Sequence, residues 1–217
     1  MPPHRPRYRT ALGLAINSLQ AHTMKTPRPH DTTPKSIERL RCQARQDVEA
    51  GAVTADYAAD RRAVLRLLDQ ALAMQIVCML RYRQHHFMQR GPLGKSLAAQ
   101  LLCHSITEQG HADLLATRIV ELGGEPDFAP DGLGARSPTE YAVGTNLQQM
   151  IRQDLIAERV AIGSYREMLL FLGERDPTTS RLLGSFLAEA EARAGELAGL
   201  MEALPVVPWT PHAACPD

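Results

Sequence analysis

The stretch Leu97–Leu122, LAAQLLCHSITEQGHADLLATRIVEL, contains an apolar helical stripe that three polar residues interrupt. Steps of three, four and seven residues place the whole stripe on one side of an α-helix, which turns by about 100° per residue. Such a stripe faces a core, and burying an unpaired carboxylate in a core costs several kcal/mol. The polar residues therefore need partners there. The stripe consists of Leu97, Leu101, His104, Glu108, His111, Leu115 and Leu122.

Glu108 and His111 are three residues apart, a spacing that brings both side chains to one helical face. A carboxylate and an imidazole in this arrangement can bind the same metal ion. The same spacing also occurs in exposed pairs and in pairs that only form hydrogen bonds. Both interpretations stay open for the isolated motif.

The composition favours a helical protein without a dominant charge. The chain has 217 residues, enough for one domain with a tail at either end, and only 5% of them are aromatic. The formal net charge is zero, so no overall field favours nucleic acid or an anionic membrane. The chain contains no uninterrupted apolar run of about 18 residues, so its sequence does not predict a membrane-spanning helix. Four scattered cysteines without a C-x-x-C pair favour reduced thiols in the cytoplasm.

Residues 1–34 are rich in Pro, Arg, His and Thr, and we expect a disordered basic arm there. Met24 is an alternative start, which would make residues 1–23 an untranslated segment. A basic arm can bind DNA through its phosphates, and an inert arm is the competing interpretation. Residues 205–217 are expected to form a C-terminal tail. The candidate nucleic-acid contacts are Arg5, Arg7, Arg9, Lys25 and Arg28.

The sequence pattern of residues 35–204 predicts a short helix followed by four long helices. The short helix covers about 36–49, and the first long helix runs from a cap at Thr54 or Asp56 to about Gln89. The second ends at Gly123-Gly124, and the irregular residues 125–136 predict a crossover along the bundle. The third starts with a Ser137-Pro138 cap and the fourth with Asp176-Pro177. The expected fold is an all-α, antiparallel four-helix bundle with a long crossover between its second and third helices.

Each of the four long helices has an apolar seam, the stripe of residues expected to face the core, and each seam carries unusual residues near its middle. In an antiparallel bundle these positions lie at about one level, so together they predict a buried polar centre. The residues are Gln75 in the first helix, His104, Glu108 and His111 in the second, Asp154 and Glu158 in the third, and Ala190 and Arg193 in the fourth.

Several short motifs between about Gly51 and Leu204 are those of one known family. They are Gly51-Ala52-Val53-Thr54, Leu80-Arg81-Tyr82-Arg83, His111-Ala112-Asp113, Leu122-Gly123-Gly124-Glu125-Pro126, Asp154-Leu155-Ile156-Ala157-Glu158-Arg159 and Asp176-Pro177-Thr178-Thr179. In them the chain resembles the ferritin-like superfamily, specifically its bacterioferritin-related, Dps-like (miniferritin-like) branch. The resemblance implies a cytoplasmic protein of iron homeostasis that forms oligomers. It also implies a di-iron site built from a glutamate of the first helix, Glu-x-x-His of the second, a glutamate of the third and Glu-x-x-His of the fourth, which oxidises Fe(II) with oxygen or peroxide.

Carried over to this chain, the resemblance implies an incomplete site. Glu108 takes the place of a bridging carboxylate, His111 of an imidazole ligand and Glu158 of a terminal carboxylate. Glu189 and Glu191 flank the substituted bridging position by about 100° and are not expected to rescue it. Gln109 stands where haem-binding members place methionine, so haem is not implied. The substituted ligand positions are Gln75, Ala190 and Arg193.

Our leading hypothesis is a ferritin-like subunit of a homo-oligomer, or of a mixed oligomer with an active subunit, whose di-iron site has become a salt-bridged network. Arg193 would supply the positive charge, because a guanidinium stays protonated in proteins. His104 would be a core histidine, and Asp154 would support His111 or an adjacent helix by hydrogen bonding. Three alternatives stay open: a single Fe, Zn or Mn ion, an active ferroxidase site, and a DNA-associated stress protein.

Overall fold

In the computed structural model, residues 36–46, 48–89 and 92–204 are described, and all their regular structure is helical. The chain divides into two units, with the boundary between Leu40 and Arg41. The predicted basic arm and C-terminal tail, including all the candidate nucleic-acid contacts, lie outside the described residues. The elements are α1 (Ile37–Gln46), the 3-10 turn η1 (Val48–Ala50), α2 (Arg61–Met88), α3 (Pro92–Glu121), α4 (Leu133–Arg136), α5 (Leu147–Leu172) and α6 (Pro177–Glu202).

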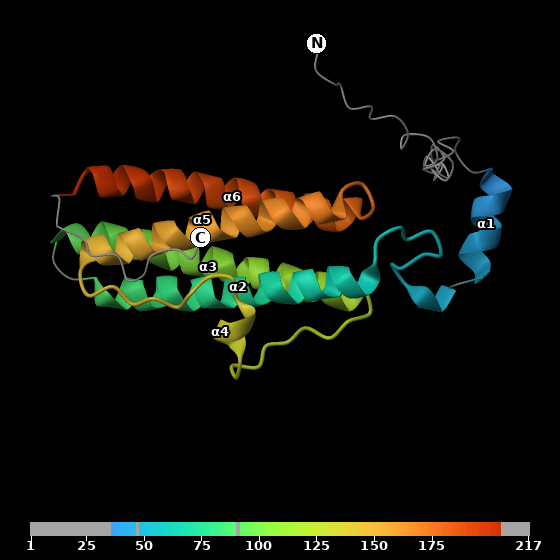
Figure 1. Cartoon of the computed structure of the whole chain (residues 1–217), viewed down its shortest axis with the longest axis horizontal. Coiled ribbons are helices and arrows are strands. Elements are labelled where there is room, and N and C mark those ends of the chain that lie inside the picture. The colour runs from blue at the N-terminus through green and yellow to red at the C-terminus, as the bar shows by residue number, and fades with distance from the viewer. Residues whose placement is uncertain (1–35, 47, 90–91, 205–217) are drawn as a thin grey trace, which may run out of the picture. The chain divides into compact units, whose positions relative to one another are not determined.

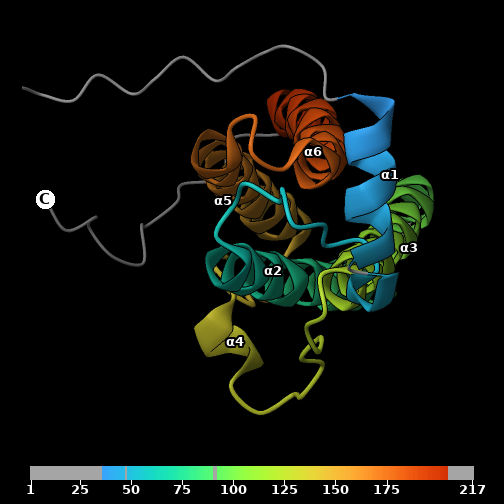
Figure 2. The same ribbon diagram turned by 90° about the vertical axis from the view of Figure 1, so that its right-hand side faces the viewer.

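Helices α2, α3, α5 and α6 form a four-helix bundle in which α2 pairs with α3 and α5 pairs with α6 (Figures 1 and 2). This confirms the predicted fold class. The chain passes from α3 to α5 along the bundle, and α4 lies in this crossover against α2. The short α4 was not expected, because we predicted residues 125–136 to be irregular.

The predicted cap of α2 is wrong, since Asp60 rather than Thr54 or Asp56 caps this helix. The Asp60 carboxylate accepts hydrogen bonds from the backbone N–H groups of Arg62 and Ala63. Thr54 instead donates its hydroxyl to Asp56 at 2.6 Å, within a turn that precedes the helix. Side-chain oxygens of this kind compete locally with helix formation, which delays the start of α2.

The predicted Ser137-Pro138 cap of α5 is wrong as well. The Ser137 hydroxyl donates to the carbonyl of Thr139 at 2.8 Å, which fixes a turn that is not helical. The next carbonyl, that of Glu140, accepts from Arg81 of α2 at 3.1 Å. The segment therefore stays extended beside α2, and α5 begins only at Leu147, where Asn146 provides the cap.

The predicted start of α6 is confirmed. Asp176 caps the helix by accepting from the backbone N–H of Thr179 at 3.0 Å. The same carboxylate accepts from Arg118 of α3 at 3.1 Å and from the Tyr57 hydroxyl at 2.7 Å. The α5–α6 turn is thereby fixed to α3 and to the segment before α2.

Helix α2 contains a long apolar window. Among the described residues it is the only helix long and apolar enough, by length and composition, to cross a membrane, and half of its apolar window is buried. The consecutive residues Ala71, Leu72, Ala73 and Met74 are all fully buried. Contacts with α3, α4 and α5 cover α2 on several sides, which is the environment of a core helix.

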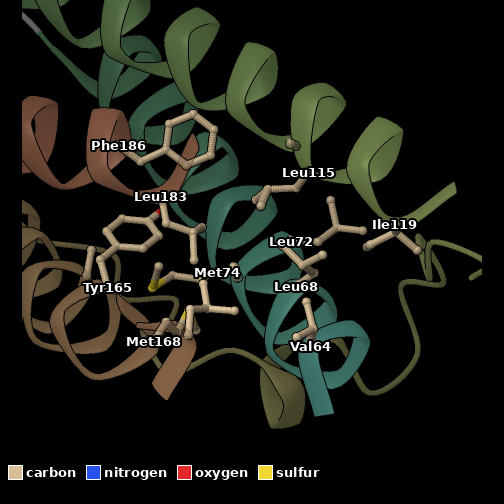
Figure 3. Close-up of a cluster of buried hydrophobic side chains, with 14 of the residues drawn as sticks. Val64, Leu68, Leu72, Met74, Leu115, Ile119, Tyr165, Met168, Leu183 and Phe186 are labelled. Carbon is tan, nitrogen blue, oxygen red and sulfur yellow. The ribbon is translucent and has the colours of Figure 1, made fainter. Parts of the chain in front are cut away.

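Two apolar clusters fill the bundle, one toward each end. The larger includes Leu68, Leu72, Leu115, Tyr165 and Phe186 (Figure 3). The smaller one consists of Tyr82, Leu97, Leu101, Ile151 and Leu197. In α3, α5 and α6 the predicted polar positions fall between the residues of these two clusters. The bundle therefore has a polar layer between two apolar layers.

Candidate functional site

All eight polar-centre positions predicted from the four seams are buried in the bundle. Each exposes 8% of its surface or less, and Ala190 and Asp154 are fully buried. The antiparallel helices bring residues 108, 158 and 193 to one level, as their places between the two apolar clusters indicate, whereas Gln75 lies among the α2 residues of the larger cluster.

Arg193 of α6 contacts both buried glutamates of the polar layer. Its Nη2 contacts Glu108 Oε1 of α3, and its Nε lies 3.3 Å from Glu158 Oε1 of α5. The Tyr82 hydroxyl of α2 donates to the same Glu158 oxygen at 2.6 Å. One guanidinium thus links two buried carboxylates from different helices, and a residue that we expected only to pack also holds one of them.

The charges of these groups are mutually dependent. Burial alone would lower the pKa of Arg193, but Glu108 and Glu158 outweigh that effect and raise it. Burial raises the pKa of the Glu158 carboxyl, and Arg193 counteracts part of that rise. The charge of Arg193 therefore favours the ionised form of Glu158, whereas burial opposes it.

His111 lies at the edge of this network. Its Nδ1 is 3.6 Å from Glu108 Oε2 and its Nε2 is 3.2 Å from Glu189 Oε2, while its ring stacks on Phe186 at 4.1 Å. Glu189 also lies 3.8 Å from Arg193 Nη1. Glu189 thus reaches the layer although it lies about 100° around α6 from Ala190, because its long, half-exposed side chain extends around the helix.

His104 lies one helical turn from Glu108, on the side of the smaller apolar cluster. Its ring meets Tyr82 edge-on at 5.2 Å, and its Nε2 is 3.6 Å from Glu196 Oε2. Burial lowers the pKa of His104, and the positive charge of Arg193 lowers it further. A buried imidazole packed edge-on against an aromatic ring is typical of a core histidine.

The two remaining substituted positions, Gln75 and Ala190, differ in what they could offer a cation. Gln75 donates its amide N–H to the Tyr165 hydroxyl, which leaves Gln75 Oε1 buried without a hydrogen-bond partner among the described residues. Glu158 Oε2 is also buried without a donor. Ala190 offers no ligating atom.

Asp154 belongs to a second buried cluster and does not contact His111. It accepts from Arg81 Nε at 2.9 Å and lies 2.9 Å from His85 Nδ1, and all three side chains are buried. It therefore supports the adjacent helix α2. Sequence reasoning missed Arg81 and His85, although their spacing from Cys78, three and seven residues, places them on one face of an otherwise apolar helix.

The donor set does not match that of a dinuclear iron site. Of the ligand positions that the resemblance implies, Glu108, His111 and Glu158 keep donors, whereas Arg193 presents only N–H groups and a positive charge. Within residues 36–46, 48–89 and 92–204, no group of three or more His, Cys, Asp or Glu side chains is arranged to hold a metal ion.

Comparisons with known proteins agree on the family. The family model described as "Ferritin-like domain" matches residues 65–206. A bacterioferritin of Desulfovibrio desulfuricans is 30% identical over 135 residues, which cover 61% of this chain and 72% of the relative.

Two solved structures show the same arrangement of helices. The dodecameric thioferritin of Bacteroides fragilis, a bacterioferritin-related protein, superposes with a TM-score of 0.64 at 25% identity, over 67% of this chain and 88% of the other. Dps of Thermosynechococcus elongatus has a TM-score of 0.62 at 21% identity, over 64% and 90%, and supports the fold alone. This chain belongs to the ferritin-like family, in its bacterioferritin-related branch.

Proposed function

We propose that this chain is a ferritin-like protein of iron metabolism whose di-iron site has been replaced by the Arg193 network, and that it serves as a structural or assembly subunit rather than a ferroxidase. The observation that carries the proposal is the guanidinium of Arg193 between Glu108 and Glu158. A fixed positive charge there neutralises the carboxylates that would otherwise attract metal. Family membership supports the link to iron but not the activity.

The network also explains how the bundle stays folded without metal. Two buried carboxylates that repel each other would destabilise the helices, and in a di-iron protein the metal ions offset this repulsion. Here Arg193 supplies a covalently attached cation, and Tyr82 supplies a hydrogen bond to Glu158. The polar layer thus carries a cation of its own, as a structural role requires.

We place the protein in the cytoplasm, as an assembly of identical copies or a mixed assembly with an active ferritin-like subunit. Kinship with bacterioferritins and with the dodecameric protein of B. fragilis supports both assignments. The sequence lacks the methionine that haem-binding members use, so we propose no haem. Sedimentation analysis of the purified chain measures the size of the assembly.

The decisive experiment is stopped-flow addition of Fe(II) under oxygen. We expect oxidation no faster than in buffer, with the D. desulfuricans bacterioferritin as the positive control for the assay. Saturable oxidation faster than buffer would overturn the proposal and restore the ferroxidase alternative. The triple variant described in the Discussion checks that the result reflects the substituted residues.

A second candidate is an iron-binding protein with a single-metal site. One observation favours it: Gln75 Oε1 and Glu158 Oε2 are buried oxygens without donors, and such groups are normally satisfied by a partner, water or an ion. Metal analysis of protein purified without chelator separates the candidates. One tightly held ion per chain, lost in Glu158→Gln but retained in Glu196→Gln, would favour the single-metal site, and no bound metal would favour the network alone.

A further inference from the structure

The outer side of α3 carries apolar side chains that the other bundle helices do not cover. Helices α5 and α6 lie on one side of the α2–α3 pair, and Glu108 of α3 faces them (Figure 2). Ile106 lies about 160° around α3 from Glu108 and exposes 56% of its surface. Leu102, one turn earlier on this outer side, is only partly buried. A helix that is apolar on opposite sides is normally covered on both of them.

Helix α2 packs on a different side of α3 and leaves this outer side open. Ser105 of α3 donates to the carbonyl of Met79 at 3.0 Å and accepts from Arg83 Nε at 3.1 Å. Ile106 lies about 100° further around α3 than Ser105, beyond that contact. Leu80, which follows Met79 on α2, exposes 42% of its surface. The uncovered apolar surface therefore extends from α3 to α2.

Two opposite charges lie at equal distances from the centre of this surface. Lys95 and Asp113 are both exposed on α3, 18 residues apart, which is about five turns or 27 Å. Whole turns place both of them on the same side of the helix, within about 20° of Ile106. Leu102 and Ile106 lie two residues on either side of the midpoint between the two charges.

This arrangement is self-complementary. When two copies of α3 cross antiparallel about a two-fold axis at the midpoint, each residue meets the one that lies equally far on the other side. Lys95 of each copy then lies opposite Asp113 of the other, and Leu102 lies opposite Ile106. The apolar residues fill the centre of the contact and the opposite charges pair at its two ends, as they do in specific interfaces.

We infer that the outer side of α3 is an isologous interface, which binds the same side of α3 on a second copy of this chain. The inference rests on the assembly of identical copies proposed above, and it identifies one contact of that assembly. The contact uses no atom of the polar layer and does not depend on iron.

Zero-length cross-linking of the full-length chain tests the contact directly. A carbodiimide joins a lysine amine to a carboxylate only when the two groups touch. The chain has three lysines, Lys25, Lys35 and Lys95, so the linked peptides are easily assigned. Lys95 cannot reach Asp113 of its own copy, because about 27 Å of rigid helix separates them. We expect a Lys95–Asp113 link, which can form only between two copies.

Point variants test the apolar centre of the contact. Ile106→Glu should reduce the Lys95–Asp113 link by about tenfold, because burial of an isoleucine contributes at least that factor to an equilibrium constant. Ile106→Leu should retain the link. Leu170→Glu makes a similar change on α5, where Leu170 exposes 82% of its surface, and serves as the matched control. We expect little change in that variant.

Charge reversal tests the pairing at the two ends. Asp113→Lys should weaken association by about tenfold in sedimentation, because the two-fold places like charges opposite each other twice. The double variant Lys95→Glu and Asp113→Lys should restore association and form the reversed link. Glu167→Lys, at an exposed position of α5, is the matched control for the single reversal.

The outcomes separate this inference from the proposed function. A full-length chain that sediments as a monomer would overturn both the interface and the assembly of identical copies. An assembly that lacks the Lys95–Asp113 link, or keeps it in Ile106→Glu, would overturn only the interface. Links from Lys25 or Lys35 to Asp113 in a monomer would show that the N-terminal part of the same copy covers this side of α3.

Discussion

Arg193 of α6 contacts Glu108 of α3 near the middle of the bundle, with 7% and 1% of the two residues exposed. This contact joins the α2–α3 pair to the α5–α6 pair across the core. The same guanidinium reaches Glu158 within α5, so removing it leaves two buried carboxylates without their main partner.

We therefore expect Arg193→Met to lower the free energy of unfolding by about 3–5 kcal/mol, the usual cost of breaking a buried ion pair from one side. Urea denaturation followed by circular dichroism measures the change. Arg166→Met is the matched control, because Arg166 and Glu191 form an exposed pair on α5 and α6. Loss of such a pair should cost less than about 1 kcal/mol. Equal losses in the two variants would contradict the role given to Arg193.

The triple variant Gln75→Glu, Ala190→Glu and Arg193→His should restore a dinuclear site. It returns two carboxylates and an imidazole to the layer and removes the cation that opposes metal binding. We expect two bound Fe(II) or Co(II) per subunit, measured by anaerobic titration. The double variant that keeps Arg193 should bind less metal. A folded triple variant that binds none would show that the four helices are aligned incorrectly with the family's ligand positions.

The residues of the polar layer could be predicted wherever helical periodicity alone determines which side of a helix faces the core. Glu108, Glu158 and Arg193 interrupt apolar stripes, and a polar residue on a core-facing stripe must meet its counterparts on other helices. The pairing of Arg193 with the two glutamates could be predicted from their opposite charges. Asp154 was assigned less well, because its partners Arg81 and His85 lie on α2, where buried residues occur on more than one face of the helix.

Element boundaries were predicted less well than the elements themselves. Thr54 and Ser137 resemble helix caps in sequence, but each uses its hydroxyl within a local turn, and Arg81 holds the carbonyl of Glu140 in extended chain. Long-range contacts of this kind have no local signal. Asp176-Pro177 was predicted correctly, because aspartate before proline at the first helical position is a strong cap signal by itself.

Acid should weaken the fold through Asp176. Burial alone would raise the pKa of this carboxyl, but hydrogen bonds from Thr179 and Tyr57 and the charge of Arg118 lower it below 3.8. A carboxyl with a lowered pKa contributes stability above its unfolded pKa, and this contribution is lost as the pH falls through the folded pKa.

Asp176→Asn should therefore cost about 1.5–3 kcal/mol at pH 7, the range for hydrogen bonds to a charged group. The difference from the unsubstituted chain should shrink as the pH falls below 3.8. Urea denaturation at a series of pH values measures both quantities. A deficit that stays constant from pH 7 to pH 3 would mean that Asp176 acts as a neutral cap and not as a charge.

The path of the α3–α5 crossover can be tested at Gly144, which lies against the first turn of α5. A Cβ added there would lie 2.5 Å from the backbone nitrogen of Met150, and backbone cannot move aside as a flexible side chain can. Gly144→Ala should therefore destabilise the bundle by about 1–3 kcal/mol, as overpacking of a core does. Gly110→Ala in α3 is the matched control, because a Cβ there meets nothing within 4 Å and alanine favours helix by roughly 0.5–1 kcal/mol. Thermal unfolding of the two variants should thus shift in opposite directions. If Gly144→Ala proved as stable as Gly110→Ala, the crossover could not pass as close to Met150 as the structure places it.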